Sequence, residues 1–260
     1  MVVGTTGSGT SVREVNGDSN MRRREKSRAG EASPKPIIVN TRKTLHLVRK
    51  VFHALAGAAF AAIYEFVLDR ERSLILFGVL FALLGLGETL RLLLPQWYLS
   101  RLALKVMRGF ARTYEVKHAS GMVFFLAGVI ICISLYPKRV AVLSILYLAV
   151  GDPCASTAGI MYGHLSTRFS NGKTAVGFMG GVVSCAVVTV AFYSREMAVS
   201  RDLLAVSVIG GLCGATTELL CGRKVENSGG PIDLDDNLAV PAGSGLLLYA
   251  ALALFYPAFL

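Results

Sequence analysis

Long apolar stretches separated by short polar segments make up most of the chain after residue 44. Most of them approach the roughly 20 residues that a helix needs to cross the hydrocarbon core of a bilayer. Backbone polar groups find no water in lipid, so we expect these stretches to be helices. The seven stretches span about residues 51–68, 73–94, 119–136, 140–151, 175–193, 203–221 and 238–257.

The pattern therefore predicts an all-α fold, a polytopic membrane helix bundle with about seven transmembrane helices. The fourth stretch is short and runs into Gly151-Asp152-Pro153. We expect a half-crossing there that restarts as a second short helix. Two pairs of glycines four residues apart let helix backbones approach closely in lipid, and we assign them to helix packing. The pairs are Gly177/Gly181 and Gly210/Gly214.

Composition supports a membrane protein and excludes a soluble one. Hydrophobic residues make up 53% of the 260 residues and charged residues only 17%, with a mean hydropathy of +0.54. A soluble domain carries nearer a quarter of charged residues. The net charge of +10 would suit a nucleic acid, but the bases lie between apolar stretches, so we expect no nucleic-acid partner. The 5 cysteines lack metal-ligand spacing and are expected to be free thiols.

Residues 1–44 are rich in Ser, Gly, Arg and Lys and show no hydrophobic periodicity. We expect a disordered, basic cytoplasmic tail, followed by a membrane-embedded domain over residues 45–260. No apolar core follows the Arg-rich run of the tail, so a signal peptide is not expected. A transit peptide is the alternative, and the acidic residues of the tail disfavour it.

The distribution of Lys and Arg predicts the orientation in the membrane. If the tail is cytoplasmic, the tail and the loops on its side hold 20 basic residues, against 6 in the loops on the other side. Positive residues concentrate on the cytoplasmic side of membrane proteins. We therefore expect a cytoplasmic amino terminus and a carboxyl terminus on the opposite side.

Four polar clusters remain after these assignments, and all four fall on the predicted cytoplasmic side. Their bases, acids and small residues surround a Gly/Ala/Ser-rich helix start, where free backbone N–H groups favour phosphate. Such a site could transfer a phosphoryl group between a soluble nucleotide and a lipid hydroxyl. The clusters span residues 49–53, 151–164, 171–174 and 233–237.

Each cluster also has a purely structural interpretation. Arg49 and Lys50 could be positive-inside anchors. Asp152 before a proline is a good helix cap, and Asp235 could cap the last helix. Three acids within residues 233–236 repel one another, however, unless a cation offsets them. A divalent metal on nucleotide phosphates would do so. The Asn-Gly-Lys-Thr run lacks the first glycine of a Walker A loop, so we predict no P-loop.

Ionisable residues within the apolar stretches are also candidates for the site, because charges are costly in lipid. Glu88 lies three residues before Arg91, so the two share a helix face and can pair. Glu218 lies near the cytoplasmic end of the sixth stretch. Glu65 lies towards the outer end of the first stretch, where we expect it to snorkel to the interface.

In order and spacing, residues 45–250 resemble the CTP-dependent lipid kinases, which comprise the yeast-type diacylglycerol kinase, dolichol kinase and phytol kinase. Two departures stand out: Phe178 replaces a usual hydroxyl residue, and the segment after Glu218 is long and Gly-rich. The resemblance rests on Arg49, Lys50, His53 and Gly57; Glu88, Arg91 and Pro95; Gly121, Phe124 and Phe125; Gly151, Asp152, Ala155, Gly159 and Gly163; Lys173 and Gly177; Glu218; and Asp235, Asp236, Asn237 and Pro241.

The resemblance is greatest to the yeast type. It implies a CTP-dependent kinase that phosphorylates diacylglycerol to phosphatidate at the cytoplasmic face of the endoplasmic reticulum membrane, with a divalent cation, Mg or Ca. It assigns catalytic roles to Asp152, Lys50, Arg49 and His53 and nucleotide or phosphate binding to Arg49, Lys50, Ala155, Ser156, Gly159 and Lys173. It also implies that Glu88, Arg91 and Glu218 line the site and that Asp235, Asp236 and Asn237 bind the metal.

Other functions stay open at this point. A dolichol or phytol kinase would differ only in the lipid acceptor. A CTP-using cytidylyltransferase would release pyrophosphate instead of CDP. A transporter would show repeated halves or a polar path across the bilayer, and the sequence shows neither. A scaffold without activity would not need the acids before the last helix. The sequence leaves the oligomeric state open.

Overall fold

The computed structural model describes residues 38–94, 96, 120–221 and 234–260, with side chains from residue 50 onward. The chain divides into two units, Met1–Lys43 and Thr44–Leu260, and the second contains every site discussed below. The expectations for residues 1–37, for Pro95, for the Gly-rich segment and for the side chain of Arg49 lie outside the described residues.

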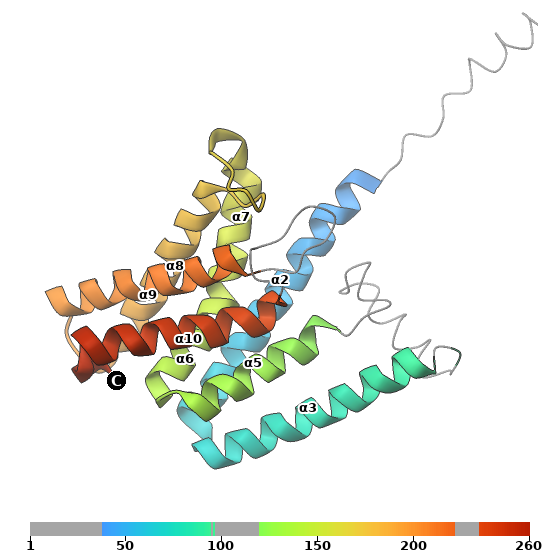
Figure 1. The fold of residues 1–260 in the computed structure, drawn as a ribbon, viewed down its shortest axis with the longest axis horizontal. Coiled ribbons are helices and arrows are strands. Elements are labelled where there is room, and N and C mark those ends of the chain that lie inside the picture. Colours follow the sequence, from blue (N-terminus) through green and yellow to red (C-terminus); the bar gives the residue numbers. More distant parts are fainter. Residues whose placement is uncertain (1–37, 95, 97–119, 222–233) are drawn as a thin grey trace, which may run out of the picture. The chain divides into compact units, whose positions relative to one another are not determined.

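All seven apolar stretches form helices (Figure 1). Within the described residues, six helical segments are long and apolar enough to cross a membrane, and the helix Gly121–Leu135 is a shorter apolar one. The predicted all-α membrane bundle is confirmed. The elements are α2 (Ile38–Ala62), η1 (Ile63–Val67), α3 (Arg70–Leu93), α5 (Gly121–Leu135), α6 (Lys138–Leu146), η3 (Tyr147–Gly151), α7 (Asp152–Tyr162), η4 (Gly163–Leu165), α8 (Ala175–Tyr193), α9 (Arg201–Leu220), α10 (Asp236–Phe255) and η5 (Pro257–Phe259).

The fourth stretch differs from its prediction. Helical backbone continues from Lys138 to Leu165 without a break, so the expected half-crossing with a restart is wrong. The turn Tyr147–Gly151 has π-helical hydrogen bonding. Pro153 explains the wider turn, because a proline has no N–H to donate and its ring clashes with the carbonyl four residues earlier. The chain absorbs the proline with a π turn directly before Asp152.

Glycines allow the helices to pack closely. A Cβ atom at Gly181 of α8 would lie 3.3 Å from the Cβ atoms of both Ala155 in α7 and Ala215 in α9. A Cβ atom at Gly214 of α9 would lie 2.8 Å from Sγ of Cys185 in α8. Small residues at such positions are typical of helix contacts in lipid. The packing role predicted for the two glycine pairs is confirmed.

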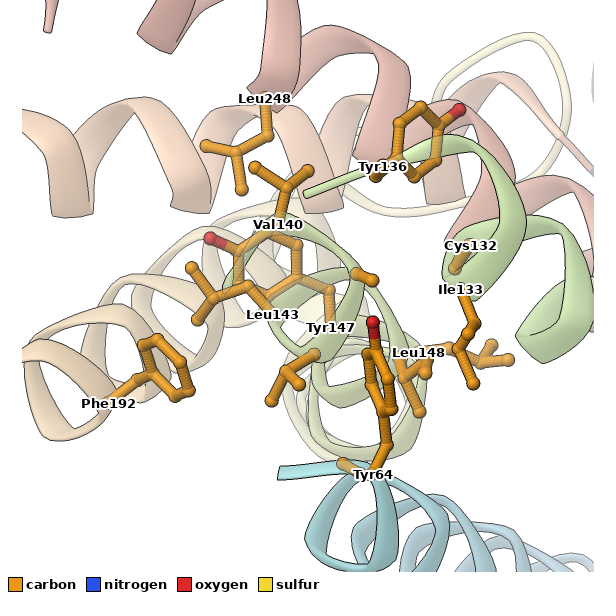
Figure 2. Packing of buried hydrophobic residues seen from close by; sticks show 14 of the residues in the cluster. Tyr64, Cys132, Ile133, Tyr136, Val140, Leu143, Tyr147, Leu148, Phe192 and Leu248 are labelled. Atoms are coloured by element: carbon orange, nitrogen blue, oxygen red, sulfur yellow. The ribbon is translucent and has the colours of Figure 1, made fainter. Parts of the chain in front are cut away.

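The buried core surrounds α6 and η3 and takes side chains from the neighbouring helices (Figure 2). Tyr147 is fully buried beside Val140 and Leu143, and its hydroxyl lies 2.7 Å from Oγ1 of Thr189 in α8. A buried hydroxyl needs a partner in so apolar a setting. This hydrogen bond therefore joins α8 to the central helix at the level of the core.

The end of the bundle at which α8 finishes carries a network of ion pairs. The Glu65 carboxylate accepts from Arg195 at 3.0 Å and lies 3.9 Å from Nζ of Lys138. Arg139 pairs with Glu196 at 2.6 Å. The Glu65 side chain is only 13% exposed, so it is held between helices instead of snorkelling as predicted. Both acids have become helix-joining contacts.

Candidate active site

A cavity of about 470 Å³ lies at the opposite end of the bundle, where α8 begins and α9 ends. Its size is within the range of small-molecule sites, roughly 300–1,000 Å³. Both bases and acids line it, together with small residues of α7 and α8. The lining residues are Lys50, Asp152, Ala155, Ser156, Gly159, Ile160, Arg168, Gly172, Lys173, Thr174, Gly177, Phe178, Glu218, Leu219 and Asp236.

Asp152 faces this cavity and does not cap a helix. Gly151 and Asp152 both have right-handed helical torsions, and no side-chain cap bond is present at this junction. Because η3 runs directly into α7, the chain has no helix start with free N–H groups here. The predicted cap and the predicted phosphate-binding helix start are both wrong at this position. The carboxylate of Asp152 makes no ion pair with any described residue, so it can interact with a ligand in the cavity.

A tight hairpin carries two of the cavity's bases. Arg168 and Thr174 pair as an isolated antiparallel bridge, and the N–H of Phe169 donates to the carbonyl of Lys173 at 2.8 Å. Gly172 has a φ of +82°, the left-handed region that favours glycine. The Asn-Gly pair therefore fixes a sharp turn. The turn brings Arg168 and Lys173 to the same cavity.

Lys173 bridges this hairpin to the carboxyl end of α9. Its Nζ lies 2.8 Å from Oε1 of Glu218 and donates to the carbonyls of Glu218 and of Cys221, the latter at 3.1 Å. The side chain of Asn171 donates to the carbonyl of Leu219 at 2.7 Å. The last carbonyls of a helix lack partners within the helix, and a cation there also suits the helix dipole. Lys173 thus holds Glu218 in the cavity as well as lining it.

Thr174 and the glycines beside it hold α7 against α8. The Thr174 hydroxyl caps α8 by accepting from the N–H of Gly177 at 3.2 Å. A Cβ atom at Gly177 would lie 2.9 Å from the carbonyl oxygen of Ala155, and one at Gly159 would lie 3.0 Å from Oγ1 of Thr174. Ala155 and Gly159 line the cavity as expected. Their small size, however, serves the contact between the two helices.

Three carboxylates converge on the cavity, those of Asp152, Glu218 and Asp236. Two of them, Glu218 and Asp236, also act on the Cys221 thiol just outside the membrane segment. Burial raises the pKa of Cys221, the Lys173 ammonium lowers it, and the Asp236 and Glu218 carboxylates raise it further. Opposite charges therefore lie close together around the cavity.

A divalent cation fits this donor set only in part. Among the described residues no three His, Cys, Asp or Glu side chains form a metal-binding group. Asp152 and Asp236 both line the cavity, and Mg²⁺ is commonly held by one or two carboxylates plus phosphate oxygens. Asp235 lies just outside: it is buried and caps α10 by accepting from the N–H of Asn237 at 3.1 Å. Its structural interpretation as a cap is confirmed.

Several predicted site residues lie away from the cavity lining. Glu88 and Arg91 form the predicted pair, with 2.6 Å between their charged atoms, but neither of them lines the cavity. His53 packs edge-to-face on Phe125, with ring centroids 5.8 Å apart. Asn237 does not line the cavity either. Roles for these residues stay predictions.

Sequence reasoning missed some of the lining. Arg168 and Phe178 line the cavity, yet neither was a candidate site residue. The Asn-Gly turn was the signal that could have found Arg168, because a hairpin pairs it with the residue after Lys173. Phe178 is the position where the chain departs from the expected hydroxyl, and it is an aromatic wall of the cavity.

Fold and site together define the class: a polytopic helical membrane protein with a cavity of mixed charge at one end of the bundle. The chain matches no protein-family profile and no solved structure significantly.

Three curated relatives, each named CTP-dependent diacylglycerol kinase 1, do match. The protein of Schizosaccharomyces pombe is 30% identical over 172 residues, 63% of this chain and 73% of the relative. That of Eremothecium gossypii is 29% identical, covering 79% of this chain and 67% of the relative. That of Saccharomyces cerevisiae is 25% identical, covering 80% and 73%. The chain belongs to the family of yeast-type CTP-dependent diacylglycerol kinases, which confirms the resemblance found in its motifs.

Proposed function

We propose that the chain transfers the γ-phosphoryl group of CTP to the hydroxyl of diacylglycerol, yielding CDP and phosphatidate. The cavity carries this proposal, because it gathers Asp152 and Asp236 with Lys50, Arg168 and Lys173 at one end of an apolar bundle. Phosphoryl transfer depends on positioning and charge stabilisation more than on covalent help. The names of the yeast relatives supply the donor and the acceptor.

The bases would hold the triphosphate. Lys50 comes from the first membrane helix and Arg168 from the hairpin, so they approach the cavity from different elements. Arg49 precedes Lys50 and is proposed to act with it. Lys173 is already bonded to Glu218 and to backbone carbonyls, so its main contribution is to fix the hairpin and keep one positive charge beside the phosphates. Together these charges offset the negative charge that develops on the leaving CDP.

Asp152 is the proposed acceptor of the lipid hydroxyl proton. As the hydroxyl oxygen forms its bond to the γ-phosphorus, the bond from that phosphorus to the β,γ-bridging oxygen breaks. The bonding pair leaves with CDP, and the hydroxyl proton passes to the Asp152 carboxylate. A base in this position contributes about 10²–10⁴-fold to a rate. The alternative role for Asp152 is to supply an oxygen to a divalent cation.

A divalent cation would neutralise phosphate charge if it is held by the Asp236 carboxylate, which the Asp152 carboxylate would join only in its alternative role. One or two carboxylates with phosphate oxygens form the set that Mg²⁺ accepts. Asp235 supports this arrangement through the cap that starts α10 and thereby fixes the direction of Asp236. We propose the cation for that reason, with Mg or Ca as the candidates.

We propose that the cavity faces the cytoplasm from the endoplasmic reticulum membrane. The cavity end of the bundle is the side that the sequence predicts to be cytoplasmic, and the segments assigned to that side hold 20 basic residues, against 6 in those assigned to the other. Positive residues favour the cytoplasmic side. An epitope tag at the amino terminus should therefore be digested by protease in sealed microsomes, and a tag at the carboxyl terminus should be protected. The reverse pattern would contradict the orientation.

The decisive experiment uses membranes that contain the overexpressed full chain. They are supplied with γ-labelled CTP or ATP and with diacylglycerol, dolichol or phytol as acceptor. We expect labelled phosphatidate from CTP, and loss of that product when a chelator removes divalent cations. Transfer from ATP alone, a labelled prenol phosphate, or release of pyrophosphate would each contradict the proposal.

A further inference from the structure

A second cavity adjoins the first and differs from it in chemistry. It is a groove of about 730 Å³ between α2, α7 and α8. Nearly all of its lining is apolar, and two of its methionines, Met161 and Met179, are 55% and 53% exposed. The hydroxyls of Thr157 and Ser184 are satisfied within their own helices. Thr157 donates to the carbonyl of Pro153 at 2.7 Å, and Ser184 donates to the carbonyl of Gly181 at 3.0 Å.

The groove and the charged cavity share one residue and one wall. Lys50 lines both of them. Helix α7 separates them, with opposite faces: Asp152, Ser156 and Gly159 face the charged cavity, while Pro153, Thr157 and Met161 face the groove. Residues three and four apart lie on one face of a helix, so each set forms a continuous stripe.

From this juxtaposition we infer that the groove between α2, α7 and α8 holds the acyl chains of the diacylglycerol acceptor and directs its hydroxyl past Lys50 to Asp152; the inference rests on the proposed function. An apolar groove whose side chains face a bilayer is filled by lipid, because a water molecule buried there would lack hydrogen-bond partners. Lipid chains gain little by leaving the bilayer for such a groove. The groove therefore orients the acceptor more than it concentrates it.

The chemistry of the lining also selects the head group. Among the described residues of the groove lining, Lys50 is the single charged one. Tyr162 lies at the carboxyl end of α7, and tyrosines are favoured at membrane–water interfaces. A neutral glycerol head can pass along apolar walls, whereas a charged phospholipid head would lose its hydration there. The new phosphate charge of the product, phosphatidate, would lie on the side of α7 that faces the charged cavity. The groove thus suits a neutral two-chain lipid with one hydroxyl.

A natural probe lies inside the groove. Cys154 lines it and is exposed, while the other four cysteines, Cys132, Cys185, Cys213 and Cys221, are buried. Maleimide labelling of the folded full-length protein in phosphatidylcholine mixed micelles should therefore modify Cys154, and Cys154→Ser should remove that label. Added dioleoylglycerol should slow the labelling of Cys154, because the acyl chains cover the thiol. Constant phosphatidylcholine in every sample keeps the lipid background equal.

Kinetics of variants give the second measurement. Met161→Trp and Met179→Trp narrow the groove from α7 and from α8, so one variant remains if the other fails to fold. We expect the KM for dioleoylglycerol to rise roughly tenfold, with little change in the KM for CTP or in kcat, as when only substrate binding is lost. Leu212→Trp is the matched control, because Leu212 is an exposed residue of α9 that lines neither cavity. It should leave all three constants unchanged.

The outcomes distinguish a failure of the groove inference from a failure of the proposed function. Active wild-type protein without protection of Cys154, or with groove variants that behave like Leu212→Trp, would overturn the inference and leave the proposed function standing. Protection of Cys154 by dioleoylglycerol without transfer from CTP would overturn the proposed function and support the groove. Protection together with a selective rise in the KM for the lipid would support both.

Discussion

The two ends of the helix bundle are built from the same kinds of charged residues, yet they differ in how the described residues use them. At the end where α8 finishes, Glu65 contacts Lys138 and Arg195, and Glu196 contacts Arg139. At the end where α8 begins, the Lys173–Glu218 pair borders about 470 Å³ of space lined by further charges.

The difference shows which charged side chains form ion pairs between helices and which line a cavity where they could bind a ligand. At the first end, the Glu65 and Glu196 carboxylates are already paired with cations, and aromatic rings cover the bases, as Phe192 does for Arg195 with 4.5 Å to the ring centroid. At the cavity end, Asp152 makes no ion pair with a described residue, and Asp236 faces the same space. Satisfied pairs join helices, whereas carboxylates and bases around a cavity can bind a ligand. The predictions below compare matched substitutions at the two ends.

The largest contrast is expected for a single carboxylate at each end. Asp152→Asn should lower kcat by about 10²–10⁴-fold, because it removes the proposed proton acceptor. Glu196→Gln, which also removes one negative charge, should leave kcat within about twofold, since it breaks only an exposed pair. Initial rates of phosphatidate formation in membranes with equal amounts of protein measure both. Comparable losses in the two variants would contradict the assignment.

Loss of one lysine at each end should affect stability differently. Lys173→Met leaves the half-buried Glu218 carboxylate and the end of α9 without their cation, and should cost roughly 3 kcal/mol of unfolding free energy. Lys138→Met should cost at most about 1 kcal/mol, because Arg195 still neutralises Glu65.

Thermal unfolding in detergent micelles measures the two lysine variants. The change at Lys173 corresponds to a fall in Tm of roughly 6–12 °C for a domain of this size. Adding Glu218→Gln to Lys173→Met should restore part of the loss, because the uncompensated charge is then removed. A double variant as unstable as the single one would show that the ion pair is not the cause.

Arginines at the two ends should differ in nucleotide binding. Arg168→Gln should raise the KM for CTP by about 10-fold or more, as expected when a hydrogen bond to a charged group of roughly 1.5–3 kcal/mol is lost. Arg139→Gln, at the other end, should leave that KM unchanged. Steady-state kinetics with varied CTP at saturating lipid compare them. An unchanged KM in both variants would remove Arg168 from the phosphate site.

The smallest effect is expected for two helix caps. Thr174 caps α8 beside the cavity, and Ser200 caps α9 at the other end. Replacing either by Ala should cost about 1 kcal/mol of stability. Only Thr174→Ala should also raise the KM for CTP, because Thr174 lines the cavity. Equal changes in KM for the two variants would mean that the cap acts through stability alone.

Much of the architecture could be predicted from the chain, and the details of the site less so. The seven helices follow from apolar length, and the Glu88–Arg91 pair follows from a spacing of three residues. The continuous helix through Asp152 could not be predicted, because whether a proline ends a helix or is absorbed by a π turn depends on the packing around it. The correct choice of Asp152 as a cavity residue therefore came from the motif, while its predicted local structure was wrong.

The sequence by itself determined that this is a helical membrane protein, where its helices lie and which family it belongs to, because these depend on local hydrophobicity and on motif order. Only the tertiary structure decided which charges share a space. Lys173 meets Glu218 across 45 residues, and Glu65 meets Arg195 across 130. Such contacts depend on how glycines bring helices together, and no local sequence pattern indicates which residues so far apart in the chain will meet. The same packing left a charged cavity beside an apolar groove, and in the proposed function that pairing lets a phosphoryl group pass from a soluble nucleotide to a lipid.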